Sequence, residues 1–290
     1  MGSHPIVQFI FYGVVLVIAM FYRHPILLGL SLLAAVVYAV RLAGWKGMRY
    51  GLLLVPVCLL SAVVNPLFSH RGETILGHFP NGAPITLEAV LYGAVSGLML
   101  AAVLLWFYSL HEVMTSDKWL YLSGRLLPTV SLLLAMVFGL IPKYRRQIKR
   151  ISDAQRGIGK DIGNGTIKER LLHGMGIMSI MATWALEHSV ETADSMRSRG
   201  YGLHGRTSYV IYRFDSRDFA MLLVELAGIA GFVAGVLTGR LQIEYYPVFS
   251  MGSQNAVTIV LYVCYGLFCF LPVIVDLVED MQWHYIQSKI

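Results

Sequence analysis

The sequence predicts an all-α polytopic membrane protein with about six transmembrane helices and long amphipathic cytoplasmic helices. Its composition is the first observation, because 56% of the 290 residues are hydrophobic and 14% are charged, whereas about a quarter of the residues in a soluble domain are charged. Long apolar runs are the second, since about 20 apolar residues cross the hydrocarbon core as a helix. The third is a basic segment, residues 143–217, with 14 of the 23 Lys and Arg residues against 7 of the 17 acids.

Apolar runs divide the chain into three parts. Four runs precede the basic segment and two follow it, at residues 5–22, 26–43, 51–68, 87–110, 219–239 and 256–276. We therefore expect N-terminal transmembrane helices in residues 1–118, membrane-associated and cytoplasmic helices in residues 119–217, and C-terminal transmembrane helices in residues 218–290.

Basic residues orient the chain, because cytoplasmic segments of membrane proteins are enriched in Lys and Arg. Arg41, Lys46 and Arg49 lie in the connection between the second and third runs. This places the connection and both termini on the cytoplasmic side of a cell inner membrane, with residues 66–86 outside and residues 111–125 inside. Contact with membrane lipids of negative charge is a simpler role for the basic residues of segment 143–217 taken singly.

Residues 126–142 are apolar but do not suit a span. Pro128 and Pro142 bracket only 13 residues, which is too short to cross a bilayer. If the basic regions on both sides are cytoplasmic, the segment begins and ends on that side, so we interpret it as embedded in the membrane without spanning it. The alternative is a short span, with the connection between the second and third runs outside.

Two helices are expected in the basic segment. The first begins after Pro142 and ends in a glycine-rich turn at residues 157–165, since glycine supplies the left-handed conformation of helix ends. Thr166 and Glu169 have the spacing of a capping box that begins the second helix. That helix carries an apolar stripe, which suits either a partner surface able to repack or burial within the same subunit. The stripe consists of Leu171, Met175, Met178, Ala182, Ala185 and Ala193.

Both cytoplasmic helices end in the pattern S-x-x-x-R-G-x-G, at residues 152–159 and 195–202, an offset of 43. A glycine after the last helical residue stops a helix, and the helix dipole favours a cation in the final turn. Arg156 and Arg199 then offer rigid forks of donors that suit carboxylates and carbonyl oxygens of a partner. The alternative is that each arginine only caps its own helix.

Several short segments follow one another in a characteristic order. They are Asn65-Pro66-Leu67-Phe68, Thr86-Leu87-Glu88 opening a span, Thr115-Ser116 before an amphipathic helix, Ile141-Pro142-Lys143-Tyr144, and the two Arg-Gly helix ends. In this order they resemble the transmembrane T component of energy-coupling factor transporters. The resemblance runs from about residue 50 to 205 and is looser in the flanking spans.

The resemblance implies a role for both helix ends. In that family each of two cytoplasmic coupling helices ends in an Ala-Arg-Gly signature that docks on one ATP-binding cassette (ABC) ATPase. The matching triplets are Gln155-Arg156-Gly157 and Ser198-Arg199-Gly200, and both lack the alanine. This implies a non-catalytic coupling subunit that transmits the motion of two ABC ATPases, a homo- or heterodimer, to a membrane S component for vitamin, cobalt or nickel uptake. The S-component contacts we expect are Met175, Met178, Ala182 and Ala185.

Signals for catalysis or cofactor binding are weak, and we expect no cofactor, no metal and no nucleic-acid partner. His111 and Glu112 begin a zinc-protease motif, but Thr115 occupies the second ligand position. Lys160 follows glycine without the Ser or Thr of a phosphate loop. Glu225, an acid inside a predicted span, is a functional candidate or a partner for a neighbouring helix. Solvated loop positions are expected for His70, Glu73 and His78. An integral-membrane enzyme and a self-contained secondary transporter remain alternatives.

Overall fold

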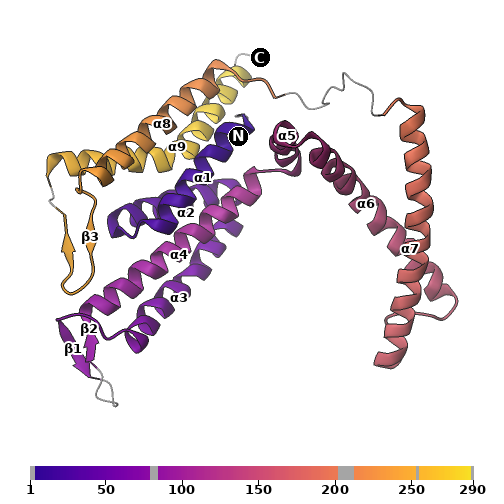
Figure 1. The fold of residues 1–290 in the computed structure, drawn as a ribbon, viewed down its shortest axis with the longest axis horizontal. Coiled ribbons are helices and arrows are strands. Elements are labelled where there is room, and N and C mark those ends of the chain that lie inside the picture. The colour runs from indigo at the N-terminus through magenta and orange to yellow at the C-terminus, as the bar shows by residue number, and fades with distance from the viewer. Residues whose placement is uncertain (1–3, 79–83, 202–211, 253–254, 289–290) are drawn as a thin grey trace. The chain divides into compact units, whose positions relative to one another are not determined.

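The computed structural model describes residues 4–78, 84–201, 212–252 and 255–288. Across these residues it consists of nine helices and two short β-hairpins (Figure 1). The chain forms two compact units, each of which is described by itself. The membrane unit comprises residues 1–115 and 212–290, and the inserted unit comprises residues 116–211.

Six helices build the membrane unit. Five are long and apolar enough to cross a membrane, and the sixth, α1, is shorter and also apolar. Each coincides with one of the six predicted runs, and the prediction of an all-α polytopic membrane protein is confirmed. The helices are α1 (Pro5–Phe21), α2 (Pro25–Ala43), α3 (Trp45–Phe68), α4 (Leu87–Val113), α8 (Ser216–Leu237) and α9 (Ala256–Gln287).

Two antiparallel hairpins interrupt the helical pattern. Strand β1 (Ile75–His78) pairs with β2 (Pro84–Thr86), and β3 (Ile243–Glu244) pairs with β4 (Ser250–Met251). The sequence indicated only a loop between α3 and α4, because strands of two to four residues are too short to show alternating hydrophobicity.

Helices α3 and α4 approach closely through glycine. A Cβ atom at Gly97 would lie 2.8 Å from the Cα atom of Cys58, and one at Gly93 would lie 2.7 Å from the carbonyl oxygen of Ser61. The close approach lets the Ser61 hydroxyl donate to the Gly93 carbonyl oxygen at 2.9 Å, and the Asn65 amide donates to a carbonyl oxygen one turn earlier in α4 at 2.6 Å. Small residues with polar partners are the usual means of joining helices in lipid.

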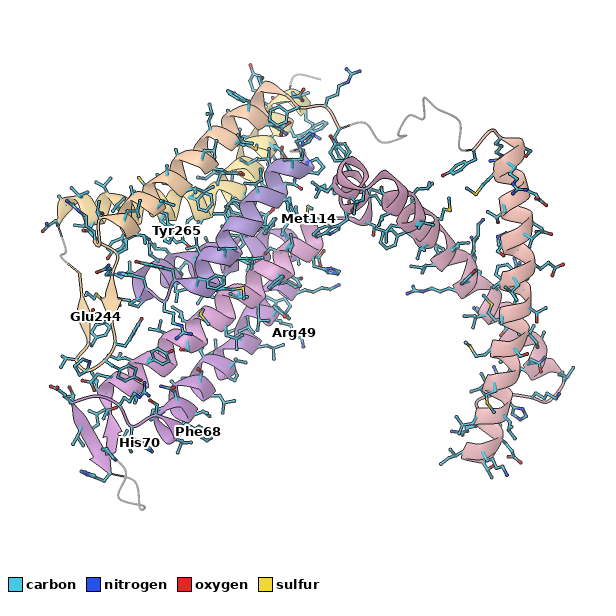
Figure 2. All side chains as sticks on the ribbon, viewed as in Figure 1. Arg49, Phe68, His70, Met114, Glu244 and Tyr265 are labelled. Carbon is cyan, nitrogen blue, oxygen red and sulfur yellow. The ribbon has the colours of Figure 1, made fainter. Side chains whose placement is uncertain are left out.

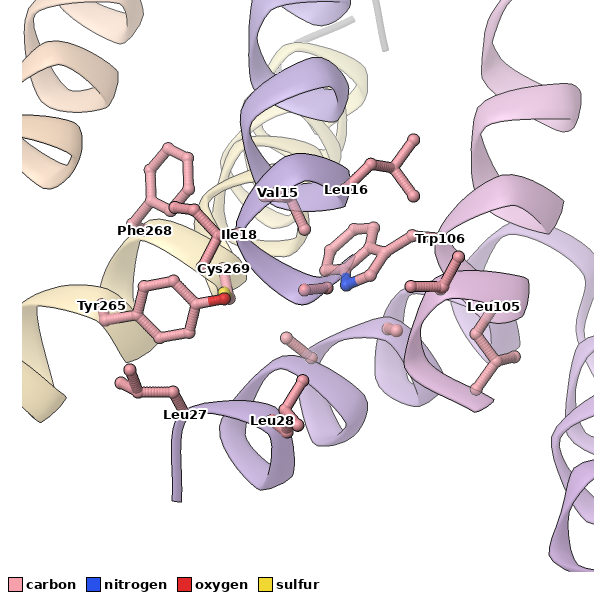
Figure 3. Packing of buried hydrophobic residues seen from close by; sticks show 14 of the residues in the cluster. Val15, Leu16, Ile18, Leu27, Leu28, Leu105, Trp106, Tyr265, Phe268 and Cys269 are labelled. Carbon is pink, nitrogen blue, oxygen red and sulfur yellow. The ribbon is translucent and has the colours of Figure 1, made fainter. Parts of the chain in front are cut away.

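Trp106 of α4 lies at the centre of the membrane unit. Its side chain is fully buried, and its indole N–H donates to the hydroxyl oxygen of Ser31 in α2 at 2.9 Å. Phe11 and Tyr12 of α1 meet the indole ring edge-on, with ring centroids 5.6 and 6.1 Å away. Figure 3 shows side chains of α1, α2, α4 and α9 gathered around this position. The core therefore joins helices that precede and follow the inserted unit.

Ion pairs join several helix termini at one end of the membrane unit. Arg41 near the end of α2 pairs with Asp280 near the end of α9. Arg217 at the start of α8 pairs with Glu279 of α9 at 2.9 Å. The backbone N–H that precedes α1 donates to a carboxylate in the first turn of α8 at 2.8 Å. The starts of α1 and α8 therefore lie with the ends of α2 and α9.

The end of α4 lies on the same side. The α3–α4 contacts are antiparallel, and α3 begins where α2 ends, so α4 finishes beside the end of α2. Figure 2 shows Met114 at this end of the membrane unit, with Phe68 and His70 at the opposite end. The chain therefore leaves the membrane unit after Thr115 and re-enters it before α8 at the same end.

The described residues of the inserted unit form three helices, α5 (Ser116–Leu126), α6 (Pro128–Gly157) and α7 (Ile167–Ser198). Helix α5 packs on the start of α6, where the Ser131 hydroxyl donates to the Leu120 carbonyl oxygen at 2.9 Å. None of the three is among the candidate membrane spans of the described residues.

Helix α6 differs from the prediction at Pro142. The proposed short segment from Thr129 to Ile141 and the basic helix after it form one continuous helix of 30 residues, with Pro142 inside it. Proline lacks the N–H that would bond one turn back, which usually ends or kinks a helix. Here Pro142 is exposed, and the helix continues past it to Gly157.

Candidate functional site

Helices α6 and α7 cross through a small apolar contact. Ile177 and Met181 of α7 are buried together with Ile151 of α6. The rings of Tyr144 and Trp184 meet edge-on beside them, with centroids 5.6 Å apart. This contact fixes the place from which the two basic helix ends project.

The end of α6 is closed by backbone hydrogen bonds around a left-handed glycine. Gly159 has φ +80°. The N–H of Lys160 donates to the Gln155 carbonyl oxygen at 2.9 Å, and the N–H of Gly159 donates to that of Arg156 at 3.0 Å. These are the two bonds of a Schellman motif. Gly157, which we expected to stop the helix, is instead its last residue.

The end of α7 is closed in the same way. Gly200 has φ +71°. The N–H of Tyr201 donates to the Met196 carbonyl oxygen at 3.0 Å, and the N–H of Gly200 donates to that of Arg197 at 3.0 Å. Arg199 is the C-cap residue. Both predicted triplets therefore lie at helix ends, and both ends have the same backbone closure. Gly202, the last position of the repeated pattern, lies outside the described residues.

The arginines at the two ends differ in their surroundings. The Arg156 side chain is 72% exposed, and its Nε atom lies 3.2 Å from a carboxylate oxygen of Asp161. Arg197 and Arg199 are exposed, and neither forms an ion pair within the part of the chain that the structure describes. The negative end of the helix dipole adds attraction for a cation at each position.

The two ends do not form one combined site. Ser198 follows the crossing residue Met181 by 17 residues, or about 25 Å along the helix axis, whereas Gly157 follows Ile151 by 6 residues, or about 9 Å. The ends are therefore at least about 15 Å apart. Figure 1 shows α6 and α7 crossing well before the end of α7. The geometry suits two separate contacts rather than one.

The apolar stripe of α7 does not face α6. Met175 and Met178 are 59% and 65% exposed, Ala182 is also exposed and Ala185 is half-buried. Burial within the described part of this subunit, the alternative left open by the sequence, therefore does not occur for the two methionines. The contact face was missed, although its apolar residues at positions 177, 181 and 184 also recur at helical spacing.

The start of α7 has the predicted capping box. The Glu169 N–H donates to the Thr166 hydroxyl oxygen at 3.4 Å, and the Glu169 carboxylate accepts from the Thr166 N–H at 2.9 Å. This backbone donor lowers the pKa of Glu169 from its usual value. The charged form of the carboxylate therefore stabilises the helix start.

The remaining candidates show no comparable arrangement. His70 is exposed at the end of the membrane unit (Figure 2). Glu225 is buried in α8, where it lines a small cavity with Gln8 and Tyr12 of α1. Among the described residues, no three His, Cys, Asp or Glu side chains lie close enough together to hold a metal ion.

Together these features define a polytopic membrane protein with an inserted helical unit whose two helix ends expose arginine. No protein-family model matches the chain. The chain is similar to a Bacillus selenitireducens protein named energy-coupling factor transporter transmembrane protein EcfT, with 27% identity over 212 residues. The match covers 67% of this chain and 74% of that protein.

Two further relatives named EcfT match over shorter segments. One, from Exiguobacterium sibiricum, is 28% identical over 99 residues, and the other, from Listeria monocytogenes, is 29% identical over 105 residues. These segments span 38% and 40% of the two relatives' own lengths. The resemblance to the T component that the sequence predicted is confirmed at this level of similarity.

Proposed function

We propose that this chain is the transmembrane coupling subunit of an energy-coupling factor importer. It would transmit the ATP-driven movement of two cytoplasmic ABC ATPases to a separate S component that binds the substrate. The observation that carries the proposal is the pair of exposed arginine-bearing ends on two crossed helices. The similarity to proteins named EcfT supports it.

Each helix end suits a contact with one ATPase. Arg156 and Arg199 offer forked donors to carboxylates or carbonyl oxygens in a groove. The Schellman closure holds the backbone around each arginine, so that a shift of the groove displaces the helix instead of unwinding its last turn. Because the ends are at least about 15 Å apart, each ATPase subunit would take one end. Closure of the ATPase pair then changes the angle at the α6–α7 crossing.

The exposed stripe on α7 suits the S component. Met175 and Met178 offer flexible apolar surface, and Ala182 and Ala185 allow a helix to approach closely. A stripe of this kind can follow a partner that changes its orientation. Under this proposal the S component selects the vitamin or the cobalt or nickel ion, and this chain has no enzymatic activity.

The basic segment supports an orientation with the inserted unit in the cytoplasm. The membrane unit would lie in the cell inner membrane, and the helix ends around Arg41, Arg217 and Met114 would face the cytoplasm, as the excess of Lys and Arg favours.

Co-purification and coupled ATP hydrolysis test the proposal. We expect two ATPase subunits to co-purify with the full-length chain, and the double variant Arg156→Ala with Arg199→Ala to lose uptake and substrate-dependent ATP hydrolysis. Each lost charge-assisted hydrogen bond costs about 1.5–3 kcal/mol, which weakens binding about ten-fold or more. Arg145→Ala is the matched control, because Arg145 is exposed on α6 well before its end. Normal uptake by the double variant would contradict the coupling role.

A further inference from the structure

The backbone closures give a structural alignment of the two helix ends that differs from the sequence repeat. If the left-handed residues Gly159 and Gly200 are superposed, the offset is 41 residues instead of 43. Gln155 then corresponds to Met196, since each carbonyl oxygen accepts the closing bond from the N–H five residues later. Arg156 corresponds to Arg197, since each carbonyl oxygen accepts the closing bond from the N–H three residues later. The repeated pattern had paired Arg156 with Arg199.

The sequence before each closure agrees with this alignment. Asp153 precedes Arg156 by three residues, and Asp194 precedes Arg197 by three residues. The pattern D-x-x-R therefore occurs at the same distance from each left-handed glycine. Under the offset of 43, in contrast, Asp153 corresponds to Met196.

The same alignment shows that the two ends are unequal. The position of Arg199 at the end of α7 is taken by Ile158 at the end of α6, and Ile158 is 66% exposed. On a helix, residues two apart point in different directions, so Arg199 adds a cation at the position where α6 has Ile158. In addition, Asp161 partly neutralises Arg156, whereas Arg197 and Arg199 have no ion pair within the described residues.

We propose that Arg197 is the α7 counterpart of Arg156 in docking, and that Arg199 is an additional contact which makes the α7 end the stronger anchor. The partner is an ATPase groove lined by carboxylate and carbonyl oxygens, because both ends present cations. This inference rests on the proposed coupling function. It assigns Arg197 a contact that the repeated pattern does not, and it makes the two ends non-interchangeable.

The affinity of single variants for the ATPase subunits that co-purify with the wild-type chain tests the inference. The full-length chain is used in lipid nanodiscs. We expect Arg197→Ala to weaken binding about ten-fold or more, and at least as strongly as Arg156→Ala. Arg145→Ala again serves as the control. Circular dichroism and hydrogen exchange of α7 show whether each variant keeps its helix.

Two gain-of-function variants make the test independent of misfolding. Ile158→Arg places a cation at the α6 position that corresponds to Arg199, and Asp161→Asn releases Arg156 from its ion pair, so both should tighten binding. Wild-type affinity of Arg197→Ala, together with weakened Arg156→Ala and Arg199→Ala, would overturn this inference and leave the coupling function intact. If no ATPase binds the wild-type chain, the coupling function fails, and this inference fails with it.

Discussion

At the scale of single residues, glycines decide both how the membrane helices pack and how the basic helices end. Gly93 and Gly97 permit backbone contact between α3 and α4 because any side chain there would overlap the neighbouring helix. Gly159 and Gly200 adopt a conformation that other residues rarely take. The sequence shows where glycines occur, but which role each one takes depends on the neighbouring helix or on the closing hydrogen bonds.

Gly97→Ala should destabilise the membrane unit. Its Cβ atom would lie 2.8 Å from the Cα atom of Cys58, so α3 and α4 must separate. Overpacking of this kind costs about 1–3 kcal/mol. Gly13→Ala is the matched control, because no atom lies within 4 Å of the added Cβ and helical alanine is favoured over glycine by about 0.5–1 kcal/mol. Thermal unfolding in detergent should therefore show a lower midpoint for Gly97→Ala only. Equal shifts in both variants would contradict the close contact.

At the scale of elements, helix starts were easier to predict than helix ends. Thr166 and Glu169 have a local spacing that suffices for a capping box, and the structure contains it. The end of α6 could be predicted only to within residues 157–165, because Gly157, Gly159 and the glycines that follow all permit a left-handed residue. Only the closing bonds to the carbonyl oxygens of Gln155 and Arg156 select Gly159. The prediction of a break at Pro142 was wrong, because a proline does not always end a helix and α6 continues through it.

The start of α7 should lose protection as the pH falls. The pKa of Glu169 is lower in the folded chain than its usual 4.5, because the charged carboxylate accepts from the Thr166 N–H. Its contribution is therefore fully present above pH 4.5 and is lost as the pH falls through the lower folded value. Hydrogen exchange at the start of α7 should be faster in Glu169→Ala than in the wild type at pH 7. This difference should shrink below pH 4.5, and one that persists at low pH would contradict the carboxylate's role.

At the scale of the whole molecule, the apolar runs sufficed to predict the six helices of the membrane unit, but they did not predict which helices pack against one another. Runs of this length have few alternatives to a membrane helix. Contacts such as Trp106 with Ser31, or Arg41 with Asp280, join residues far apart in sequence and leave no local pattern. The crossing of α6 and α7 was missed because two adjacent faces of α7 both carry apolar residues at helical spacing, and only packing selects one.

The α4 end and the α8 start lie at the same end of the membrane unit, and this predicts which side of the membrane individual residues face. Both lie at one end of the membrane unit, so residues 116–211 must cross the bilayer an even number of times. After replacement of the free cysteines Cys58, Cys264 and Cys269, single cysteines at the exposed positions Thr115 and Arg213 should react with a membrane-impermeant maleimide from the same side. A cysteine at His70 should react from the other side. In inside-out vesicles, the maleimide should label the cysteines at positions 115 and 213 if the basic segment is cytoplasmic. Labelling of positions 115 and 213 from opposite sides would require an odd number of crossings and would make the apolar half of α6 a span, which would remove one coupling-helix end from the cytoplasm.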